Sequence, residues 1–406
     1  MEVKKFFNEY KILLTTAVIF LSAVVVLTVS LKVTVGNKHT SSGENDTSNK
    51  SSVSKKNIKF EDGEMCEQAS SAGESESLAE FTTETTTVAA IVPTTTAPSA
   101  VTETYPEGPI FVTSSTVTVK VGSEKIPEPM ICIDDNDKKV VPTVEGYYDL
   151  NTVGNYNLTR VAKDSDGHVT RFPFVLNVVS EISATSSSTQ TTSKLSFSDA
   201  LSMYKKSDTA VGIDVSKWQG DIDWEKVKNA GCEFVFIRLG VQNGFGGESK
   251  LDTYFVDNFK GAQAAGLKVG IYYYTYATDK SEAASQAKFV LKTLSENSFK
   301  PDLPIVYDWE SWNKLGSLGM SINDLNDCAE AFLSTVEKAG YDGMLYSSKY
   351  YLEKTLWRLD TSKYPVWLAH YVTQTSYDGS YSIWQCSCTG RISGINADVD
   401  INVMYY

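Results

Sequence analysis

The sequence predicts an α/β protein whose main domain, residues 206–406, is an irregular TIM-like β/α barrel. A small all-β sandwich over 105–180 and an N-terminal transmembrane helix are predicted to precede it. Three observations support this organisation. Ala-Gly pairs recur where a helical stretch ends and an apolar strand begins, as in AAGLKVGIYYY. Short β-branched runs separated by turn residues fill 105–180, and an uncharged run of 20 residues, 12–31, stands near the N-terminus.

The uncharged run is long enough to span the hydrocarbon core of a membrane as a helix. Lys4, Lys5 and Lys11 favour a cytoplasmic tail at 1–11, an anchor at 12–35 and the remaining chain outside the cell. A cleaved signal peptide is the alternative, although its apolar region is usually shorter and ends at a small-residue cleavage site. We therefore expect a single-pass membrane protein with its large domain extracellular, or a secreted protein if the segment is cleaved.

Three segments connect the anchor to the barrel. Residues 36–104 are rich in Ser, Thr and Glu with few large apolar groups, which predicts a disordered stalk. Residues 105–180 alternate like strands, and their run VGNYNLTRVAKDSDGHVTRFPFVLNVV resembles the final hairpin of bacterial immunoglobulin-like domains. Residues 181–205 read as a second polar linker. The sandwich is interpreted as a spacer, with wall or glycan binding as the other possibility.

The barrel region shows eight strand-like runs with helical stretches between the first of them. The runs are 211–217, 234–240, 268–276, 304–310, 343–348, 365–370, 382–387 and 398–404. The clearest helix starts at Ser321, where apolar residues recur at spacings of three and four. The last three runs are joined by segments without room for full helices, so we expect five β-α units closed by three plain strands.

Composition excludes several classes of function. The net charge of −13 argues against nucleic acid as a partner. The three histidines are too far apart in the chain for a multi-histidine metal site within one domain, and we predict no metal and no cofactor. The six cysteines show no zinc spacing, and a Cys232–Cys328 pair stays open. Oligomeric state cannot be deduced.

Acidic residues gather at the ends of the predicted strands, where a parallel barrel places its functional groups. Asp308 and Glu310 end one strand, while Asp214 lies in the first strand and Asp400 in the last. Residues two apart on a strand share a face, so Asp308 and Glu310 are expected side by side. Crowded carboxylates raise the pKa of at least one member, which can then act as a general acid near neutral pH.

Aromatic and polar residues are expected to line the same end of the barrel. The candidates for substrate binding are Tyr272, Tyr274, Trp367, Trp384, Gln385 and Arg238. Carboxyl groups between aromatic walls suit sugar hydrolysis, because they supply a proton and stabilise an oxocarbenium-like transition state. Two other interpretations stay open from the residues alone: an ion-pair network that includes Arg238, and a Ca²⁺ or Mg²⁺ site formed by the acids.

Five motifs in order, GIDVSKWQGDIDW, PIVYDWE, VWLAHY, IWQCS and DVDIN, together resemble glycoside hydrolase family 25. These are peptidoglycan muramidases of the Chalaropsis lysozyme type, and the resemblance covers the whole last domain. It implies hydrolysis of the β-1,4 bond between N-acetylmuramic acid and N-acetylglucosamine in peptidoglycan glycan strands. It also implies Glu310 as general acid with Asp308 as its partner, and Asp214 and Asp400 as groups that tune the pKa of Glu310 and hold substrate.

The sequence departs from the family pattern at two places. The third strand reads YYYTYA and has no His, and the seventh reads Trp384-Gln385-Cys386 where Trp-Gln-Tyr is usual. Both departures bear on how a sugar is gripped rather than on Asp308 and Glu310. Two alternative functions remain beside the muramidase: a non-catalytic wall-binding module, and a glycosidase that acts on another N-acetylated polysaccharide.

Overall fold

The computed structural model describes residues 106–182 and 195–406, which belong to one compact unit. The predicted tail, anchor and stalk, and residues 183–194 of the predicted linker, lie outside the described residues. Among the helices that are described, none is long and apolar enough to cross a membrane.

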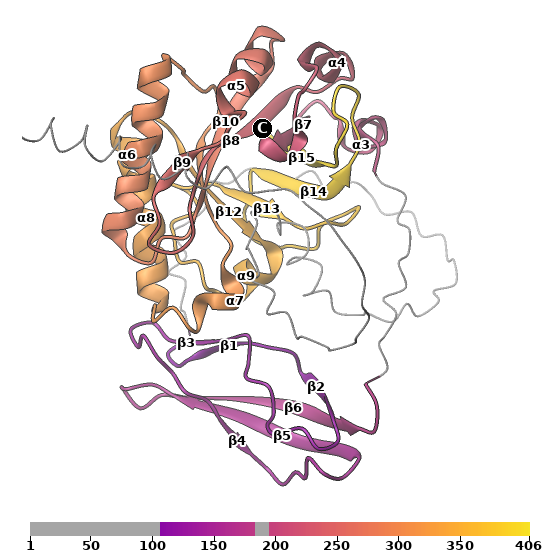
Figure 1. The fold of residues 1–406 in the computed structure, drawn as a ribbon, viewed down its shortest axis with the longest axis vertical. Helices are drawn as coiled ribbons and strands as arrows, with labels where there is room; N and C mark the ends of the chain where they lie inside the picture. Colours follow the sequence, from indigo (N-terminus) through magenta and orange to yellow (C-terminus); the bar gives the residue numbers. More distant parts are fainter. Residues whose placement is uncertain (1–105, 183–194) are drawn as a thin grey trace, which may run out of the picture. The chain divides into compact units, whose positions relative to one another are not determined.

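The N-terminal described region, residues 106–182, is built only of strands and loops (Figure 1). Its elements are β1 (Ile110–Val112), β2 (Thr116–Lys120), β3 (Ile131–Ile133), β4 (Thr143–Glu145), β5 (Gly154–Lys163) and β6 (Val169–Val179). One sheet has the order β2-β6-β5-β4, and β1 pairs with β3 in a second sheet. The pairings of β4 with β5 and of β5 with β6 are antiparallel, whereas β2 pairs with β6 in parallel, and the likeness to immunoglobulin-like domains stays a prediction.

The long hairpin of β5 and β6 is held by the turn that the DSDG sequence predicts. The backbone N–H groups of Gly167 and His168 each donate to Asp164 Oδ1 at 2.7 Å, so one carboxylate closes the turn. Alternate residues of β6, including Phe174, Leu176 and Val178, are buried. This alternation is the period expected of a sheet with one face on a core.

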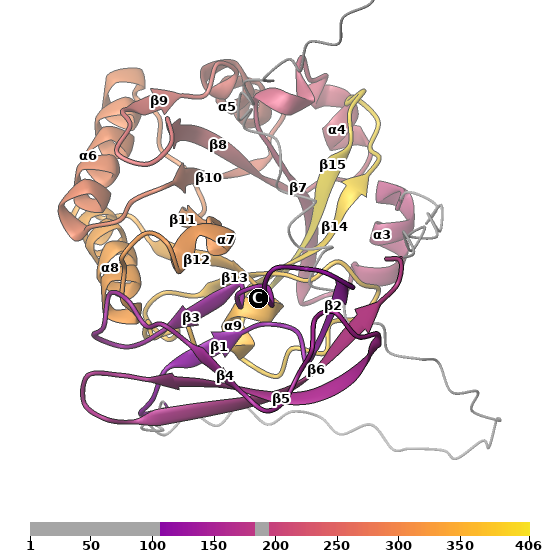
Figure 2. The same ribbon diagram turned by 60° about the horizontal axis from the view of Figure 1, so that its bottom comes forward.

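Residues 195–406 form the barrel, whose strands follow the order β10-β11-β12-β13-β14-β15-β7-β8-β9 (Figures 1 and 2). The strands are β7 (Thr209–Val215), β8 (Phe234–Gln242), β9 (Ser249–Leu251), β10 (Lys268–Thr275), β11 (Ile305–Trp309), β12 (Gly343–Ser348), β13 (Val366–Ala369), β14 (Ile383–Gly390) and β15 (Val399–Tyr405). A further pairing of β8 with β10 closes the cylinder, and β9 adds to β8 as the second arm of a hairpin.

Helices surround the cylinder on the outside (Figure 2). They are α3 (Phe197–Tyr204), α4 (Trp224–Asn229), α5 (Phe255–Ala264), α6 (Lys280–Asn297), α7 (Trp312–Leu315), α8 (Ile322–Lys338) and α9 (Lys349–Glu353), with a 3-10 turn η1 (Lys217–Gln219). The helix predicted from Ser321 is α8. Ser321 and Asp324 form its capping box, and Gly340 at φ 87° follows its C-terminal end.

Side chains fill the interior of the cylinder. Phe234 and Phe236 on β8 pack there with Tyr272 and Trp367, while the alternate residues of β8 face the helices. A Cβ at Gly270 would lie 2.3 Å from the Phe236 ring, so only glycine leaves room for this ring. The interior is thus a packed aromatic core that supports the residues at the open end of the barrel.

The barrel part of the predicted fold class also needs correction. A TIM-like barrel is parallel throughout, whereas β15 runs antiparallel to both β14 and β7. Antiparallel neighbours need only a short loop, while parallel neighbours need a crossover of about a dozen residues or more. The helices are also shorter than five full β-α units imply, since α4 has 6 residues and α9 has 5. The described domain is a closed eight-stranded β-barrel of mixed strand direction, with helices packed around it.

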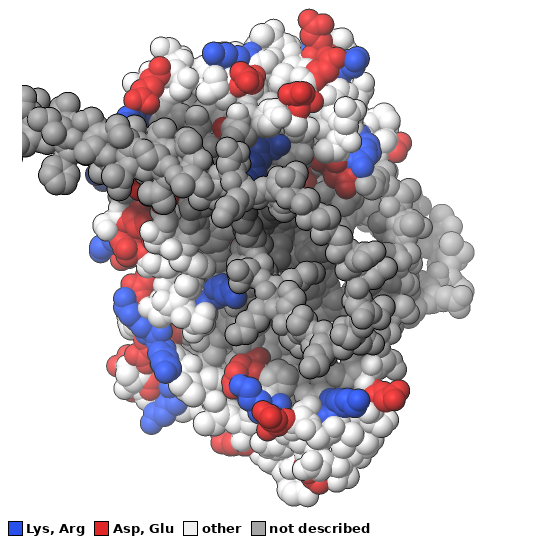
Figure 3. All heavy atoms as spheres, in the orientation of Figure 1, with Lys and Arg blue, Asp and Glu red and all other residues white. Residues whose placement is uncertain are grey.

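Charge is mixed on the surface. On the face drawn in Figure 3, basic and acidic side chains of the described residues are interspersed rather than gathered by sign. The two cysteines whose pairing the sequence left open, Cys232 and Cys328, are buried free thiols. Neither the surface charge nor these cysteines therefore defines a site.

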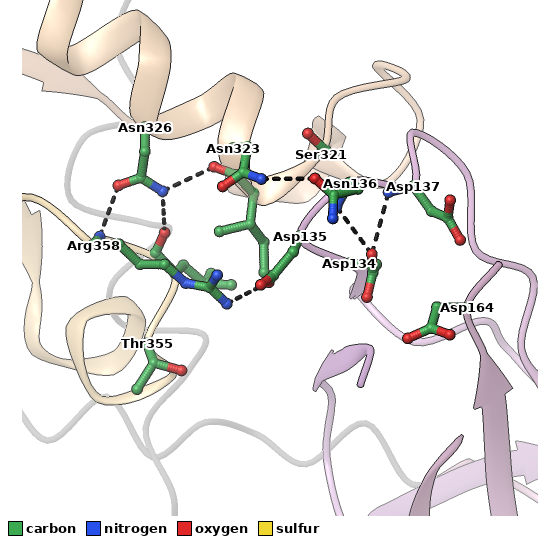
Figure 4. Close-up of polar contacts among 12 residues, drawn as sticks. Asp134, Asp135, Asn136, Asp137, Asp164, Ser321, Asn323, Asn326, Thr355 and Arg358 are labelled. Atoms are coloured by element: carbon green, nitrogen blue, oxygen red, sulfur yellow. Dashed lines mark hydrogen bonds and ion pairs between the residues drawn. The ribbon is translucent and has the colours of Figure 1, made fainter. Parts of the chain in front are cut away.

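Residues 134–136 contact the start of α8 and the loop after α9 (Figure 4). The carbonyl oxygens of Asp134 and Asp135 accept hydrogen bonds from the N–H groups of Ile322 and Asn323, at 2.8 and 3.1 Å. These N–H groups belong to the first turn of α8, where a helix offers no partner of its own. The Asp135 carboxylate forms an ion pair with Arg358. Main-chain and side-chain contacts thus join the two described regions.

Candidate active site

Four carboxyl groups meet at the end of the barrel where the parallel strands finish. Asp214 and Asp400 are direct partners in the pairing of β7 and β15. Asp308 ends β11 next to Tyr274 of β10, and Glu310 follows two residues later. Electrostatic repulsion from Asp214 contributes to the raised pKa values of Asp308 and Glu310, so the two pairs act on each other. The structure therefore brings together the acids that were predicted from three distant segments.

Two buried amides hold Asp214. Its Oδ2 accepts hydrogen bonds from Gln385 Nε2 at 2.9 Å and from Asn402 Nδ2 at 2.8 Å. The amide oxygens are satisfied in turn. Trp367 Nε1 donates to Asn402 Oδ1 at 2.8 Å. Gln385 Oε1 accepts from the hydroxyls of two tyrosines. Each amide is thereby oriented with its NH₂ toward the carboxylate, which favours a charged Asp214.

The surroundings of Asp214 and Asp400 favour a proton on Asp400 rather than on Asp214. Burial raises the pKa of Asp214, but the hydrogen bonds from Asn402, Gln385 and Asp400 lower it again. Burial raises the pKa of Asp400 well above the ordinary range, and repulsion from Asp214 raises it further. A protonated Asp400 can then donate to a negatively charged Asp214.

The second pair is arranged for proton donation. Burial raises the pKa of Asp308 to about 7, although its hydrogen bond with Glu310 lowers that pKa. Burial raises the pKa of Glu310 well above its usual value, and repulsion from Asp308 adds to this. Asp308 Oδ1 and Glu310 Oε1 are buried without a hydrogen-bond partner among the described residues. Burial and repulsion from Asp308 thus favour the protonated form of Glu310, and both side chains retain an oxygen for another molecule.

Four of the predicted substrate-binding residues lie at this group. Tyr272 and Trp367 face the interior and meet edge to face, with ring centroids 6.2 Å apart. Repulsion from Glu310 contributes to the raised pKa of the Tyr274 hydroxyl, which places this hydroxyl near the acid. Gln385 contacts Asp214 directly. The first two residues support the site, and Tyr274 and Gln385 stand beside its carboxyl groups.

The other two predicted binding residues, Trp384 and Arg238, have partners besides the four acids. Trp384 lies on the outer face of β14, where its Nε1 donates to the His370 carbonyl at 2.7 Å and its ring meets Tyr204 of α3. Arg238 is buried and forms an ion pair with Asp252 at 2.8 Å. Burial is the main cause of the raised pKa of Asp308, and the charge of Arg238 lowers that pKa, so Arg238 acts on the acids, whereas Trp384 supports the barrel.

Sequence reasoning missed three residues of the site. Asn402 follows Asp400 by two on the same strand, so the rule that alternate residues share a face would have found it. Tyr346 and Tyr371 donate to Gln385 Oε1 at 2.9 and 3.0 Å, and both stand in or directly after a predicted strand. In the sequence, these two tyrosines look like tyrosines that fill a core. Only their contacts with Gln385 show that they belong to the site.

Comparisons with known proteins match the barrel region. The sequence profile of glycosyl hydrolases family 25 matches residues 213–395. The uncharacterized protein YegX of Escherichia coli (strain K12) is 32% identical over 198 residues, which are 48% of this chain and 69% of YegX. The autolytic lysozyme of Clostridium acetobutylicum is 30% identical over 192 residues, 47% of this chain and 54% of that protein.

Solved structures give a weaker likeness. The modular autolysin LytC from Streptococcus pneumoniae, in complex with a synthetic peptidoglycan ligand, matches with a TM-score of 0.44 at 22% identity, over 61% of this chain and 56% of LytC. A family 25 glycosyl hydrolase from Bacillus anthracis matches with a TM-score of 0.41 at 23% identity, over 50% of this chain and 90% of that chain. From the match over residues 213–395 and the relation to YegX, the chain belongs to glycosyl hydrolases family 25 and is a glycoside hydrolase.

Proposed function

We propose that the barrel is a muramidase, which hydrolyses the β-1,4 bond between N-acetylmuramic acid and N-acetylglucosamine in peptidoglycan. The observation that carries this proposal is the buried pair of Asp308 and Glu310, in which each side chain keeps one oxygen without a partner among the described residues. Membership of family 25 supports the reaction class, and two relatives carry the names autolytic lysozyme and lysozyme M1. The barrel would act outside the cytoplasm, where peptidoglycan lies.

In the proposed reaction, Glu310 is the general acid. Its raised pKa keeps the carboxyl group protonated at neutral pH, so it can protonate the oxygen of the leaving sugar as the glycosidic bond breaks. The positive charge that develops on the remaining sugar lies near Asp308, whose pKa of about 7 leaves a large fraction ionised. After departure of the first sugar, Glu310 is an anion and can take a proton from the attacking water.

The pair of Asp214 and Asp400 has a supporting role in this proposal. Its single negative charge raises the pKa of Glu310 and adds to the negative potential near the developing cation. Gln385 and Asn402 keep that charge on Asp214. The chain is acidic overall, with a net charge of −13, so affinity for an anionic wall must come from contacts at the site.

The test is product analysis with the full chain. Purified protein mixed with peptidoglycan should release new reducing ends at muramic acid, and Glu310→Gln should abolish release while the protein still binds the polymer. Binding without any new reducing ends would indicate a wall-binding module. Turnover of chitin oligosaccharides without turnover of peptidoglycan would indicate another polysaccharide. Release that survives in Glu310→Gln would contradict the assignment of the acid.

A further inference from the structure

The tip of the hairpin formed by β8 and β9 carries an exposed aromatic ring. The sequence there is NGFGG, and Phe245 stands between Gly244 and Gly246, whose φ values are 73° and 66°. The Phe245 side chain is 42% exposed. The hairpin extends β8 past its C-terminal end, which is the end of the barrel that carries the acids. The ring is therefore presented to solvent on the same side as the site.

Phe245 is the outer member of a row of three rings. Its ring meets that of Tyr276 edge to face at 5.2 Å, and Tyr276 meets Tyr274 in the same way at 5.3 Å. Tyr274 stands directly beside Asp308 in the pairing of β10 with β11. Single exposed apolar residues are common on protein surfaces and need no explanation. These three rings differ from such isolated residues, because they form a continuous row from a buried acid to the solvent.

A buried amide fixes the outer part of this row. Gln242 is 0% exposed, and its Oε1 accepts hydrogen bonds from the backbone N–H of Tyr276 and from Gln286 Nε2, both at 2.8 Å. Its Nε2 donates to the Gly247 carbonyl at 3.3 Å and to the Glu282 carboxylate. One side chain thus binds the hairpin tip, the end of β10 and helix α6 to each other. The spacing of Phe245 and Tyr276 is set by the fold.

Further contacts constrain the shape of the hairpin tip. A Cβ at Gly247 would lie 2.1 Å from the Asn243 carbonyl oxygen, so the turn admits only glycine there. At the base of the hairpin, the Tyr273 hydroxyl donates to Ser249 Oγ at 2.6 Å. An aromatic ring held at a fixed place costs less conformational entropy on binding than one on a mobile loop.

We propose that Phe245 and Tyr276 form a platform that binds a pyranose ring of the glycan strand outside the pair of sugars that is cleaved. This rests on the proposed function, because it takes the strand to run from Glu310 along the aromatic row. The exposed flat ring of Phe245 matches the apolar face of a sugar, and Tyr276 supports that ring edge to face. The platform would make binding depend on strand length.

The experiment measures binding in a Glu310→Gln background, so that hydrolysis does not interfere. The probes are soluble, uncrosslinked glycan strands from peptidoglycan, as one disaccharide unit and as strands of several units, with chitin oligosaccharides as a second series. Phe245→Ala should weaken the binding of long strands about 3- to 10-fold, the size of one aromatic contact. In Phe245→Ala, the affinity for long strands should exceed that for short strands by a smaller factor than in the protein that keeps Phe245.

Three variants separate ring stacking from other effects. Phe245→Trp should restore long-strand binding, whereas Phe245→Leu, which keeps an apolar side chain but removes the flat ring, should behave like Phe245→Ala. Leu251→Ala removes another exposed apolar side chain of the same hairpin, 41% exposed, and should leave binding unchanged. Thermal unfolding of each variant shows whether the fold is intact.

Several outcomes would overturn the platform. They are equal loss on short and long probes, no loss with Phe245→Ala, or the same loss with Leu251→Ala. Failure of the proposed function is recognised separately, since a wild-type chain that releases no reducing ends from peptidoglycan can still show length-dependent binding through Phe245. Dependence on Phe245 for chitin oligosaccharides alone would support the platform and contradict peptidoglycan as the substrate.

Discussion

Asp214 and Asp400 face each other directly across the antiparallel pair of β7 and β15. Two like charges at opposed positions of a sheet destabilise it. Here Gln385 and Asn402 donate to Asp214 alone, and the pKa of Asp400 is raised well above its usual range. These contacts favour a proton on Asp400 and a negative charge on Asp214.

The first prediction concerns Asn402. Asn402→Ala removes one of the two amide donors to Asp214, so the pKa of Asp214 should rise and its charge should be lost at a higher pH. We expect kcat/KM on peptidoglycan to fall about 10- to 100-fold, as for a hydrogen bond to a charged group, and the acid limb of the pH profile to move upward. Asn323→Ala, an amide at the start of α8, is the control. A uniform loss of activity with an unmoved pH profile would refute a role through Asp214.

The second prediction concerns stability and pH. The pKa of Asp308 is raised from 3.8 in the unfolded chain to about 7 in the folded one, mainly by burial. The folded state thus binds the proton more tightly, so this contribution to stability is complete below 3.8 and lost as the pH rises through about 7. Asp308→Asn should therefore raise Tm at pH 8 by roughly 5–10 °C and much less at pH 4.

Asp360, whose carboxyl group is exposed, should show the opposite dependence of stability on pH. The pKa of Asp360 is lowered by hydrogen bonds from the side chain and the backbone N–H of Ser362. Its contribution to stability is present at neutral pH and lost in acid, so Asp360→Asn should lower Tm slightly at pH 8. Calorimetric scans of both variants across this pH range test the signs. A Tm gain for Asp308→Asn that is the same at pH 4 and pH 8 would contradict the raised pKa.

The third prediction concerns the buried ion pair of Arg238 and Asp252. Replacing one partner, as in Arg238→Met, leaves a buried charge alone and should cost about 3–5 kcal/mol of unfolding free energy. The double variant with Asp252→Asn should be less destabilised than the sum of the single variants. Urea unfolding of the four proteins measures the coupling. Strict additivity would show that Arg238 does not act through Asp252.

The fourth prediction concerns the contact of residues 134–136 with α8. The amides of Ile322 and Asn323 donate to the carbonyls of Asp134 and Asp135, so they should exchange slowly with solvent. Asp135→Asn removes the ion pair with Arg358 and should speed the exchange of both amides about 5- to 10-fold, as expected for the loss of roughly 1 kcal/mol. Exchange that stays unchanged would show that the ion pair adds nothing to this contact.

Much of the site could be predicted from the sequence because strand periodicity is local. Asp308 and Glu310 share a face wherever their strand lies, and their neighbour Trp309 must then face the helices. The same rule was available for Trp384 and Gln385, which are adjacent on β14 and so cannot both face the interior. Gln385 contacts Asp214, whereas Trp384 meets α3.

The direction of β15 and the partner of Arg238 could not be predicted in this way. Both depend on contacts between segments far apart in the chain. A strand pattern has the same period whether its neighbour runs parallel or antiparallel, so DVDINV alone does not distinguish the two. Asp252 stands in a short segment between β9 and α5, and nothing in that segment marks it as the partner of a buried guanidinium.

The contact at the start of α8 is made largely by main-chain atoms, since two of its hydrogen bonds join carbonyl oxygens to amide N–H groups. Any residue other than proline can supply such a donor, and every residue supplies the acceptor. Evolution could therefore replace each side chain at this junction and still preserve the attachment. Relatives could therefore keep this contact without sharing any of its residues, and only their structures would show that the contact is conserved.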